Sequence, residues 1–385
     1  MRIVLSSDIY PPVVSGVSTV VDKQSRALAA RGHEVVVIAP GYPPYSRIPI
    51  TKNLSHYSIW AIPNILRDNS YTGFVPSSHI RTMFNEFHPD LVHFHSIGPI
   101  GYPTLKAAKH LRIPTIATLH GIPQFITAYT PWLTKTSKKN THRALWLVLR
   151  NYYNQMQYIT APSQFASNQM REHGVTPPIT VLPMWIDKPV LPINSQSVRK
   201  KFSLPKGHYI FLYIGRIDRD KNLLVALLAA EKLKHIASSF RIVFAGKGSY
   251  LPALKNLTNK RSLSDVISWI GYIEESDKFN FYRQADSFIM PSSVETQSLT
   301  TLEAIQSGLP VIIANAGALP EIEHQFGEQC TLFQYNDPNE LARVMAHQLH
   351  VNSKIYSPHL FKSYYSKNYH IRSLEGLYKK LINVK

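Results

Sequence analysis

Two glutamates, Glu295 and Glu303, stand eight positions apart behind a short apolar segment, residues 287–290. Each carboxylate oxygen offers two lone pairs, so glutamates at the end of a strand can accept hydrogen bonds from several sugar hydroxyls. A helix is predicted to begin near Leu299 and Thr300, and the first N–H groups of a helix are donors for an anion. Two simpler roles stay open, because Thr300 and Glu303 have the spacing of a capping box and Glu295 can be a solvated loop acid.

A basic loop follows a second apolar segment, residues 209–214. It has the sequence Gly215-Arg216-Ile217-Asp218-Arg219-Asp220-Lys221-Asn222. A guanidinium binds two phosphate oxygens at once and an ammonium adds a point charge, so Arg216 and Lys221 can clamp an anion. An ordinary basic loop is the alternative. The clamp is favoured because the loop is expected to open at the same sheet edge as the glutamates.

The same loop contains Asp218-Arg219-Asp220, the D-x-D pattern that is associated with metal-bound nucleotide sugars. Because Arg216 and Lys221 can take the place of a divalent cation, we interpret the two aspartates as surface charge balance. His93 and His95 alternate on another predicted strand, but no third ligand is evident for them. The sequence therefore predicts no metal site.

Three further candidate residues lie at predicted strand ends. Gly246 belongs to a G-x-G, a weak signature that here predicts close backbone approach at the edge of a binding pocket. Gly16 precedes the first helix, where the missing side chain lets N–H groups approach an anion; a tight turn is an equal alternative. A lone histidine is usually structural, and only its place at a strand end makes His120 a candidate.

Twelve short apolar segments are predicted to be the β-strands that position these residues. They cover residues 2–6, 34–39, 91–95, 115–119, 158–161, 179–182, 209–214, 241–245, 266–269, 287–290, 311–314 and 331–333. Most are continuous apolar runs, which are typical of parallel strands with helices on both faces. One predicted helix is capped by Ser18 and stopped by Gly32, and another covers residues 300–306. The alternation of strand and helix predicts an α/β fold with two doubly wound, Rossmann-like domains.

The 385 residues, 44% of them hydrophobic, are enough for two packed cores, since a single core rarely grows past about 250–300 residues. The proline-bearing stretch at residues 187–195 is the expected boundary. We therefore predict an N-terminal acceptor-binding domain (1–190), a C-terminal domain that binds a nucleotide sugar (196–368) and a C-terminal helix (369–385) that can cross back to the first domain. The single cysteine excludes a disulfide framework and fits a reducing cytoplasm.

The formal net charge of +18 attracts anions without choosing among nucleic acid, anionic lipid and phosphorylated substrates. No segment approaches the roughly 18 apolar residues of a membrane-spanning helix, and no secretory signal is found. Residues 130–150 mix cations with tryptophan and leucine, and Leu145, Leu149, Tyr152 and Tyr153 lie near helical spacing. This pattern predicts either a helix lying on an anionic bilayer or, equally, a helix with a core face and a solvated basic face.

Together these motifs resemble glycosyltransferase family four, a family of retaining enzymes with the two-domain GT-B fold, over nearly the whole chain. The matching positions are the Glu-x7-Glu signature at Glu295 and Glu303, its flanks Pro291-Ser292, Leu302-Glu303-Ala304 and Ser307-Gly308-Leu309-Pro310-Val311, the G-R-x4-K-N motif at Gly215, Arg216, Lys221 and Asn222, and the loop with Pro12 and Gly16. The sequence departs from the family where Ser15 or Val17 replaces a second glycine, at Ser298, and after Pro183.

The resemblance implies a role for each matching residue. Arg216 and Lys221 resemble the ligands of the donor diphosphate, Glu295 the residue that holds the donor sugar and Glu303 the one that holds the ribose. The remaining matches are Gly16 and Gly215 near the diphosphate, His120 beside the donor sugar, Gly271-Tyr272-Ile273 near the nucleobase, and Gly246, Leu299 and Thr300 along the donor pocket. Among these, Arg216, Lys221, Glu295 and His120 are the residues implied to be catalytic, chiefly through electrostatic stabilisation of the leaving diphosphate.

The expected reaction is transfer of a hexose from a UDP- or GDP-sugar to a hydroxyl of a lipid, glycolipid or saccharide, with no cofactor required. The opening segment looks similar to bacterial diacylglycerol glucosyltransferases and mannosyltransferases, so we expect a cytoplasmic protein, peripheral on the inner face of the membrane. One alternative is a sugar-nucleotide epimerase or hydrolase on the same fold. Another is a non-catalytic protein that binds anionic lipid or nucleic acid, but no RNA-binding motif is present and a nucleic-acid partner is not expected.

Overall fold

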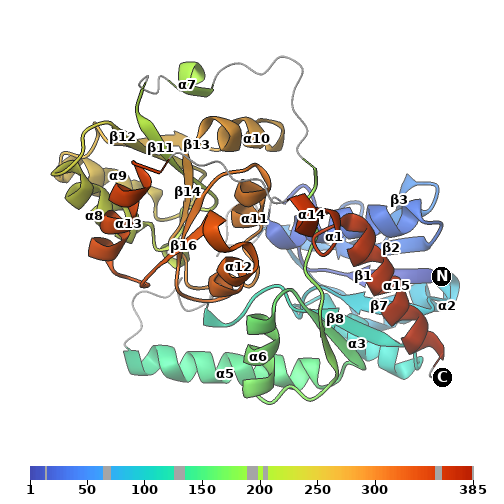
Figure 1. The fold of residues 1–385 in the computed structure, drawn as a ribbon. Coiled ribbons are helices and arrows are strands. Elements are labelled where there is room, and N and C mark those ends of the chain that lie inside the picture. Colours follow the sequence, from blue (N-terminus) through green and yellow to red (C-terminus); the bar gives the residue numbers. More distant parts are fainter. Residues whose placement is uncertain are drawn as a thin grey trace. The chain divides into compact units, whose positions relative to one another are not determined.

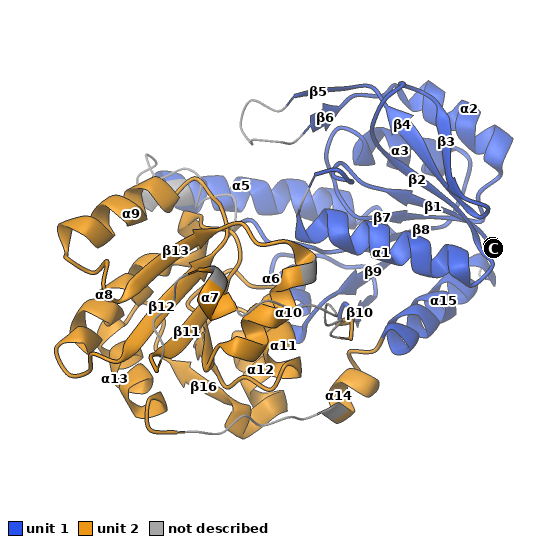
Figure 2. Ribbon diagram, turned by 90° about the horizontal axis from the view of Figure 1, so that it is seen from above, with its two compact units in different colours: residues 1–123, 135–184, 367–385 blue, residues 124–134, 185–366 orange. Residues whose placement is uncertain are grey.

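The computed structural model describes residues 1–13, 15–63, 71–124, 135–188, 198–202, 207–351 and 358–383. The chain divides into two compact units (Figures 1 and 2). Unit 1 comprises Met1–Pro123, Lys135–Met184 and Lys367–Lys385, and unit 2 comprises Gln124–Thr134 and Trp185–Ser366. Most of the expected boundary, residues 189–195, lies outside the described residues.

Unit 1 is built on an eight-stranded sheet with the order β10-β9-β8-β7-β1-β2-β4-β3. Its strands are β1 (Arg2–Ser6), β2 (Glu34–Pro40), β3 (Arg47–Thr51), β4 (Leu54–Ile59), β7 (Leu91–Phe94), β8 (Thr115–Thr118), β9 (Tyr158–Ala161) and β10 (Ile179–Val181). Neighbouring strands pair in parallel, except that β3 pairs antiparallel with β4. Successive residues of β1, β2 and β7 are buried, as expected for strands covered on both faces.

The helices of unit 1 are α1 (Gly16–Ala30), α2 (Ser77–Phe87), α3 (Gly101–His110), α5 (Lys135–Tyr153), α6 (Gln164–Glu172) and α15 (Lys367–Asn383), and a hairpin of β5 (Ala61–Pro63) and β6 (Tyr71–Gly73) adds a small second sheet. The predicted cap of α1 is wrong by one turn. Ser15 is the N-cap, and its side chain accepts a hydrogen bond from the N–H of Ser18. Ser18 itself is buried.

Helix α15 belongs to unit 1, although it follows unit 2 in the sequence (Figure 2). Its Glu375 accepts hydrogen bonds from Arg31 at 2.6 and 2.8 Å and lies 2.8 Å from Nε2 of His33. The hydroxyl of Tyr378 lies 2.7 Å from Nδ1 of His93 on β7. These contacts confirm the expectation that the C-terminal helix returns to the first domain.

Unit 2 contains a six-stranded parallel sheet with the order β13-β12-β11-β14-β15-β16. Its strands are β11 (Tyr209–Ile214), β12 (Phe240–Ala245), β13 (Ile267–Gly271), β14 (Ser287–Met290), β15 (Val311–Ala314) and β16 (Cys330–Phe333). The chain builds outward from β11 on one side and then returns to build β14 on the other. The order therefore reverses between β11 and β14, and such a switch point is where open α/β sheets bind ligands.

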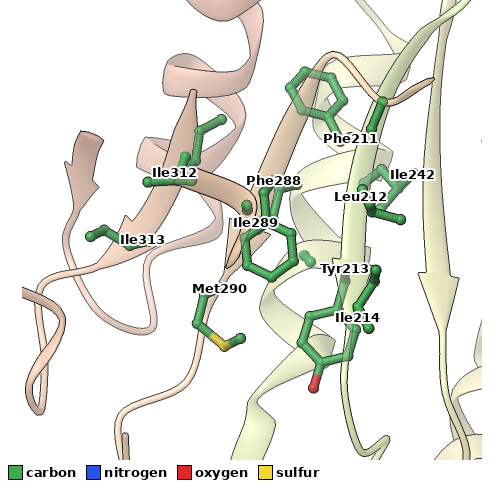
Figure 3. Packing of buried hydrophobic residues seen from close by; sticks show 14 of the residues in the cluster. Phe211, Leu212, Tyr213, Ile214, Ile242, Phe288, Ile289, Met290, Ile312 and Ile313 are labelled. Atoms are coloured by element: carbon green, nitrogen blue, oxygen red, sulfur yellow. The ribbon is translucent and has the colours of Figure 1, made fainter. Parts of the chain in front are cut away.

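The helices of unit 2 are α7 (Val198–Lys201), α8 (Leu223–Lys234), α9 (Leu251–Lys260), α10 (Glu275–Gln284), α11 (Leu299–Gln306), α12 (Leu319–Phe326), α13 (Pro338–Gln348) and α14 (Pro358–Lys362), with short 3₁₀ turns at Arg219–Lys221 and Gly327–Gln329. The central strands supply the core beneath them (Figure 3). Phe211, Tyr213, Phe288 and Ile312 are each completely buried in it. The strands on either side of the switch point are thus anchored in the core.

All twelve predicted strands are present, with ends that differ by no more than two residues, and the prediction of two Rossmann-like α/β units is confirmed. Strands β3, β4, β5 and β6 were not predicted. Within the described residues no helix is long and apolar enough to cross a membrane.

Candidate functional site

The two loops that carry the sequence motifs leave neighbouring strands of unit 2. The basic loop follows β11, and the loop with Glu295 follows β14, so both open at the carboxyl edge of the sheet beside the switch point. Asn222, which has φ of 51°, ends the 3₁₀ turn of the basic loop and begins α8. The prediction that both motifs open at one sheet edge is borne out by this topology.

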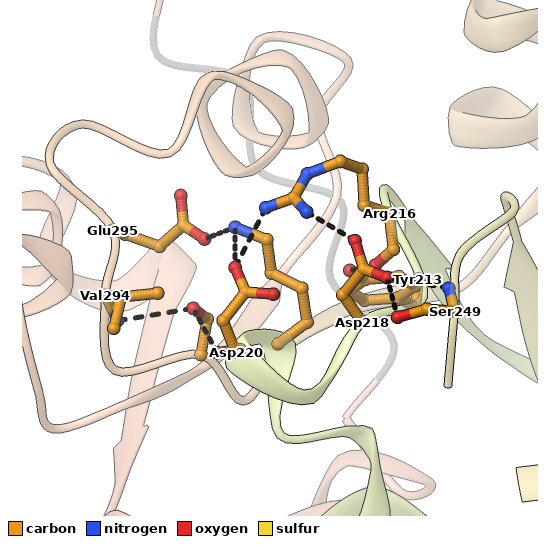
Figure 4. Close-up of polar contacts among 9 residues, drawn as sticks. Tyr213, Arg216, Asp218, Asp220, Ser249, Val294 and Glu295 are labelled. Atoms are coloured by element: carbon orange, nitrogen blue, oxygen red, sulfur yellow. Dashed lines mark hydrogen bonds and ion pairs between the residues drawn. The ribbon is translucent and has the colours of Figure 1, made fainter. Parts of the chain in front are cut away.

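Side chains from the two loops form one network of ion pairs (Figure 4). The Nζ atom of Lys221 lies 2.6 Å from Oε1 of Glu295 and 3.7 Å from Oδ2 of Asp220. Arg216 donates from Nη2 to Oδ2 of Asp220 at 2.9 Å and from Nη1 to Oδ2 of Asp218. Three of the predicted donor-site residues, Arg216, Lys221 and Glu295, therefore meet in one place.

Glu295 is not a solvated loop acid, because only 12% of its side chain is exposed. Burial alone would raise the pKa of this carboxyl group. The charge and hydrogen bond of Lys221, a hydrogen bond from Ser292 and the charge of Arg216 outweigh that effect, and the net pKa is lowered. Glu295 is thus held as a carboxylate that can accept hydrogen bonds.

The interpretation of Asp218 and Asp220 as surface charge balance is wrong. Both residues are buried, with exposed fractions of 6% and 5%. Oδ1 of Asp218 also accepts hydrogen bonds from the backbone N–H and the hydroxyl of Ser249, at 2.7 and 2.8 Å. The sequence pattern does not show that both aspartates pair with the guanidinium of Arg216. Among the described residues, no group of three or more His, Cys, Asp or Glu is placed to hold a metal ion.

The predicted close backbone approach at Gly246 is directed at the basic loop. A Cβ at Gly246 would lie 1.8 Å from the carbonyl oxygen of Gly215, and one at Gly248 would lie 2.3 Å from that of Ile217. Backbone hydrogen bonds join Gly215 to Ala245 at 3.0 Å and Gly246 to Gly271 at 2.7 Å. Glycine here lets the loops after β11, β12 and β13 pack against one another.

The loop predicted to lie near a nucleobase adjoins this packed region. Tyr272 is 44% exposed, and Nζ of Lys247 lies 5.7 Å from the centre of its ring. Ile273 is partly buried against the core. An exposed aromatic ring beside a cation offers a surface on which a planar base can stack.

Glu303 makes a different set of contacts. Its carboxylate lies 2.7 Å from Nζ of Lys278 and accepts a hydrogen bond from the hydroxyl of Tyr282 at 3.0 Å, both on α10. Burial raises its pKa, although Lys278 opposes the shift. Glu303 is the fifth residue of α11 and the N-cap is Ser298, which makes no side-chain cap hydrogen bond. The capping-box interpretation is therefore wrong.

Ser298 has a left-handed backbone, with φ of 61° and ψ of 70°. This conformation favours glycine. The hydroxyl of Ser298 lies 2.8 Å from that of Thr301. Leu299 and Thr300 open α11 as expected, and the carbonyl of Thr300 accepts a hydrogen bond from Tyr282.

Sequence patterns missed Gly317, which supports the Glu295 loop from the neighbouring strand end. It has φ of 61°, and a Cβ there would lie 2.9 Å from the carbonyl oxygen of Glu295 and 3.0 Å from that of Ser293. The next N–H, of Ala318, donates to the same Glu295 carbonyl at 3.0 Å. The one sequence feature that could have indicated this role is the position of a glycine shortly after the predicted strand at 311–314.

In unit 1, His120 adjoins the buried histidines His93 and His95. Its Nε2 is 2.9 Å from Nδ1 of His95, and burial lowers its pKa to about 4. His93 and His95 also have pKa values well below the usual value because they are buried. These are neutral side chains at the ends of β7 and β8.

Gly16 is the first residue of α1, and a Cβ there would meet no atom within 4 Å. It is also absent from the residues with positive φ. Local packing and backbone geometry therefore do not require glycine at this position, and the tight-turn alternative gains no support.

Helix α5 has one buried apolar face. Trp146, Tyr152 and Tyr153 are buried, and Leu149 packs against the core of unit 1, whereas Leu147 and Val148 are 43% and 60% exposed. The predicted face with Leu149, Tyr152 and Tyr153 is thus a core face, as in the alternative interpretation. Residues 130–134 of the same stretch lie outside the described residues.

Two doubly wound α/β units, with a basic loop and carboxylates at the switch point of the second, give the chain the architecture of the GT-B fold. Sucrose-phosphate synthase from Thermosynechococcus elongatus shares the fold, with a TM-score of 0.78 at 18% identity and complete coverage of both chains. HepE from Anabaena, solved in complex with UDP and glucose, has a TM-score of 0.73 at 14% identity, also with complete coverage.

Family models match both parts of the chain: "Glycosyltransferase Family 4" at residues 14–188 and "Glycosyl transferases group 1" at residues 194–355. The chain belongs to this family of glycosyltransferases. It is 26% identical to alpha-monoglucosyldiacylglycerol synthase from Acholeplasma laidlawii, over all of this chain and 98% of the relative. It is 27% identical to GDP-mannose-dependent alpha-mannosyltransferase from Mycolicibacterium smegmatis, over 82% of this chain and 80% of the relative.

Proposed function

We propose that this glycosyltransferase transfers a hexose from a nucleotide-diphosphate-sugar to a hydroxyl group and retains the configuration at the anomeric carbon. The observation that carries the proposal is the ion-pair network at the switch point of unit 2. There the Arg216 and Lys221 cations lie beside Glu295, and Lys221 is 2.6 Å from the carboxylate. Cations beside a sugar-binding acid suit a ligand in which a diphosphate adjoins a sugar.

The proposed roles follow the charges and contacts. Arg216 and Lys221 bind the diphosphate and stabilise the negative charge that grows on it as the glycosidic bond breaks. Glu295 accepts hydrogen bonds from the hydroxyls of the donor sugar. Glu303 accepts hydrogen bonds from the ribose through lone pairs that Lys278 and Tyr282 leave available.

Several backbone and ring groups complete the proposed donor site. Gly215, Gly246, Leu299 and Thr300 present backbone atoms, and Tyr272 with Ile273 lies near the base. Gly16 and His120 keep the roles that the resemblance implies for them. Retention is proposed from the family, with the leaving diphosphate taking the proton of the incoming hydroxyl on the same face.

Nucleotide binding is the first test. We expect thermal stabilisation by UDP or UDP-sugars, or by GDP or GDP-sugars, with the other base weaker. Ligand at about 100 times its dissociation constant should add about 2.7 kcal/mol of stability. Protein that binds neither set would contradict the proposal.

The reaction type needs a second measurement with the donor so identified. NMR of the product should show the anomeric configuration of the donor when an acceptor is supplied. Incubation of labelled donor without an acceptor should release little free sugar and no epimer. Rapid acceptor-independent turnover would instead favour the epimerase or hydrolase alternative.

We propose that the acceptor is a lipid or glycolipid, reached from an anionic membrane surface on the cytoplasmic side. Of the two relatives named above, one is an alpha-monoglucosyldiacylglycerol synthase and the other is a GDP-mannose-dependent alpha-mannosyltransferase. The β5–β6 hairpin supplies a suitable surface in unit 1. Trp60, Ile62, Tyr71 and Phe74 flank or belong to it and are 41–46% exposed. Aromatic side chains favour the membrane interface, and the charge of +18 favours anionic lipid.

Sedimentation with vesicles tests this surface. Wild-type protein should bind vesicles of anionic lipid at low salt and bind neutral vesicles more weakly. Replacing Trp60 and Phe74 by serine should reduce binding, whereas Tyr102→Ser, a 59% exposed tyrosine on α3, is the matched control. Equal loss in the control, or no binding by the wild type, would count against the hairpin.

A further inference from the structure

We infer that Asp218 and Asp220 are positioning residues for donor binding, which hold the guanidinium of Arg216 in the orientation that receives the diphosphate. This inference rests on the proposed function, because it assumes that Arg216 binds the diphosphate. The D-x-D sequence of this chain would then serve neither to bind a metal ion nor to balance charge at the protein surface.

The guanidinium is anchored at both of its ends. Nη1 donates to Asp218 and Nη2 donates to Asp220 (Figure 4). Two anchors fix the plane of a rigid, planar group, and the N–H groups that remain point in directions set by that plane. Arg216 is also the most exposed member of the network, with 34% of its side chain accessible, so a ligand can reach it.

The anchors are themselves buried and hydrogen-bonded. The side chain of Asp220 is fully buried, and that of Asp218 is 9% exposed. The second carboxylate oxygen of Asp218 is held by the N–H and the hydroxyl of Ser249, in the loop that follows β12. Packing and hydrogen bonds of this kind preorganise a group before its ligand arrives.

Asp220 also ties the basic loop to the Glu295 loop. Its Oδ2 lies 2.9 Å from Arg216 and 3.7 Å from Lys221, and its backbone carbonyl accepts a hydrogen bond from Ser292 at 3.3 Å. Its Oδ1 is buried and makes no hydrogen bond within the described structure. A buried oxygen without a partner is unfavourable to folding, so the placement of this carboxylate is better explained by the cations than by stability.

The formal charges of the network distinguish two explanations for the aspartates, positioning of Arg216 and simple charge balance. Two cations, Arg216 and Lys221, face three carboxylates, Asp218, Asp220 and Glu295, which gives 2 − 3 = −1. If the aspartates only balance charge, neutralising one should strengthen the binding of an anionic nucleotide. If they position Arg216, neutralising one should weaken binding even though the site becomes more positive. The two explanations predict opposite signs.

The experiment measures UDP and GDP affinity by calorimetry, and kcat and KM with the active donor, for Asp218→Asn and Asp220→Asn. We expect each variant to lose affinity and kcat/KM by roughly tenfold to a hundredfold, the effect of a misplaced binding group. The matched control is Asp265→Asn, which removes a surface ion pair with Lys234 at 2.8 Å in the same unit. The control should bind like the wild type.

A double-mutant cycle with Arg216→Ala shows whether the effect passes through the arginine. If Asp220 acts by positioning Arg216, Asp220→Asn should add almost nothing once the guanidinium is gone. The same loss in both backgrounds would mean a general structural role and would overturn the inference, as would unchanged or tighter nucleotide binding by the single variants. If the wild-type protein binds no nucleotide, the proposed function fails and the inference falls with it. If the wild type binds nucleotide and the two aspartate variants bind it equally well, the inference alone fails.

Discussion

Arg216, in the loop after β11, is the single side chain whose proposed role has the most direct test. If Arg216 binds the diphosphate as proposed, Arg216→Ala removes a charge-assisted donor to the leaving group. Loss of such a donor raises the barrier by about 3–4 kcal/mol, so kcat should fall by roughly 10²- to 10³-fold. Steady-state rates measure this. Arg216→Lys keeps the charge but loses the planar fork, and recovery of full activity in that variant would show that charge alone suffices.

Ser298 makes a separate prediction about stability. Its left-handed backbone is strained for serine, and its hydroxyl lies 2.8 Å from that of Thr301. Ser298→Ala keeps the strain and loses the hydrogen bond, so it should lower the free energy of unfolding by about 1 kcal/mol. Ser298→Gly loses the same bond but relieves about 1–2 kcal/mol of strain, and it should be close to neutral. Denaturant titrations that rank alanine as stable as glycine would contradict this explanation.

Among the candidate residues, those in the loops that follow apolar strands were predictable, and those on other elements were not. Arg216 and Lys221 lie in the loop after β11 and Glu295 in the loop after β14, and parallel strands bring such loops to one edge. Lys278 lies on a separate helix, and no spacing along the chain links it to Glu303. Asp218 and Asp220 were misinterpreted because the pattern of acids and bases in a loop does not show which of them are buried.

At the scale of elements, the packing of the loops after β11 and β12 depends on glycine. Gly246→Ala would place a Cβ 1.8 Å from the carbonyl oxygen of Gly215, so backbone must move. We expect a loss of about 2 kcal/mol or more in unfolding free energy and weaker nucleotide binding, because the displaced loop carries Arg216. Thermal melting and calorimetry measure the two effects.

Gly376 is the matched control for this variant. It lies within α15, and a Cβ there would meet no atom within 4 Å. Gly376→Ala should therefore stabilise the protein by about 0.5–1 kcal/mol, the helix propensity difference. Destabilisation by both alanines would show that glycine removal is harmful for reasons other than the close contact at Gly246.

The strands that sequence patterns missed lie mostly at the edge of the first sheet or outside it. In β3 every second residue is exposed, and Pro49 interrupts the apolar pattern. In β4 the polar residues Ser55, His56 and Ser58 stand among the apolar ones. A strand covered on both faces produces a continuous apolar run, which is why the parallel strands were found. An edge strand has one pairing partner and is partly exposed to solvent. Its sequence therefore lacks the continuous apolar run that identifies a buried strand.

At the scale of the whole molecule, buried histidines make stability depend on pH. Burial lowers the pKa of His120 and of His370 to about 4, from an ordinary value of about 6.5. Between these values the unfolded chain binds more protons than the folded one, so stability is complete above about pH 6.5 and falls as the pH drops toward 4. Melting temperatures from pH 7.5 to 4.5 should show this decline.

Removal of one histidine tests the cause of that decline. A histidine contributes up to about 1.4 kcal/mol for each unit of pKa difference. His370→Gln should therefore melt lower than wild type at pH 7.5, where the imidazole contacts the carbonyl of Pro183 at 2.7 Å, yet lose less stability on acidification. Parallel curves for the two proteins would place the pH dependence elsewhere.

The return of α15 to unit 1 has a consequence for how the protein is made. During synthesis the strands of unit 1 leave the ribosome first, but their covering helix, with Glu375 and Tyr378, follows only after all of unit 2. At 5–20 residues per second, the segment between Met184 and Lys367 imposes a wait of roughly 10–40 s. The nascent first sheet must pass that interval without this covering helix, while unit 2 can close as soon as it emerges.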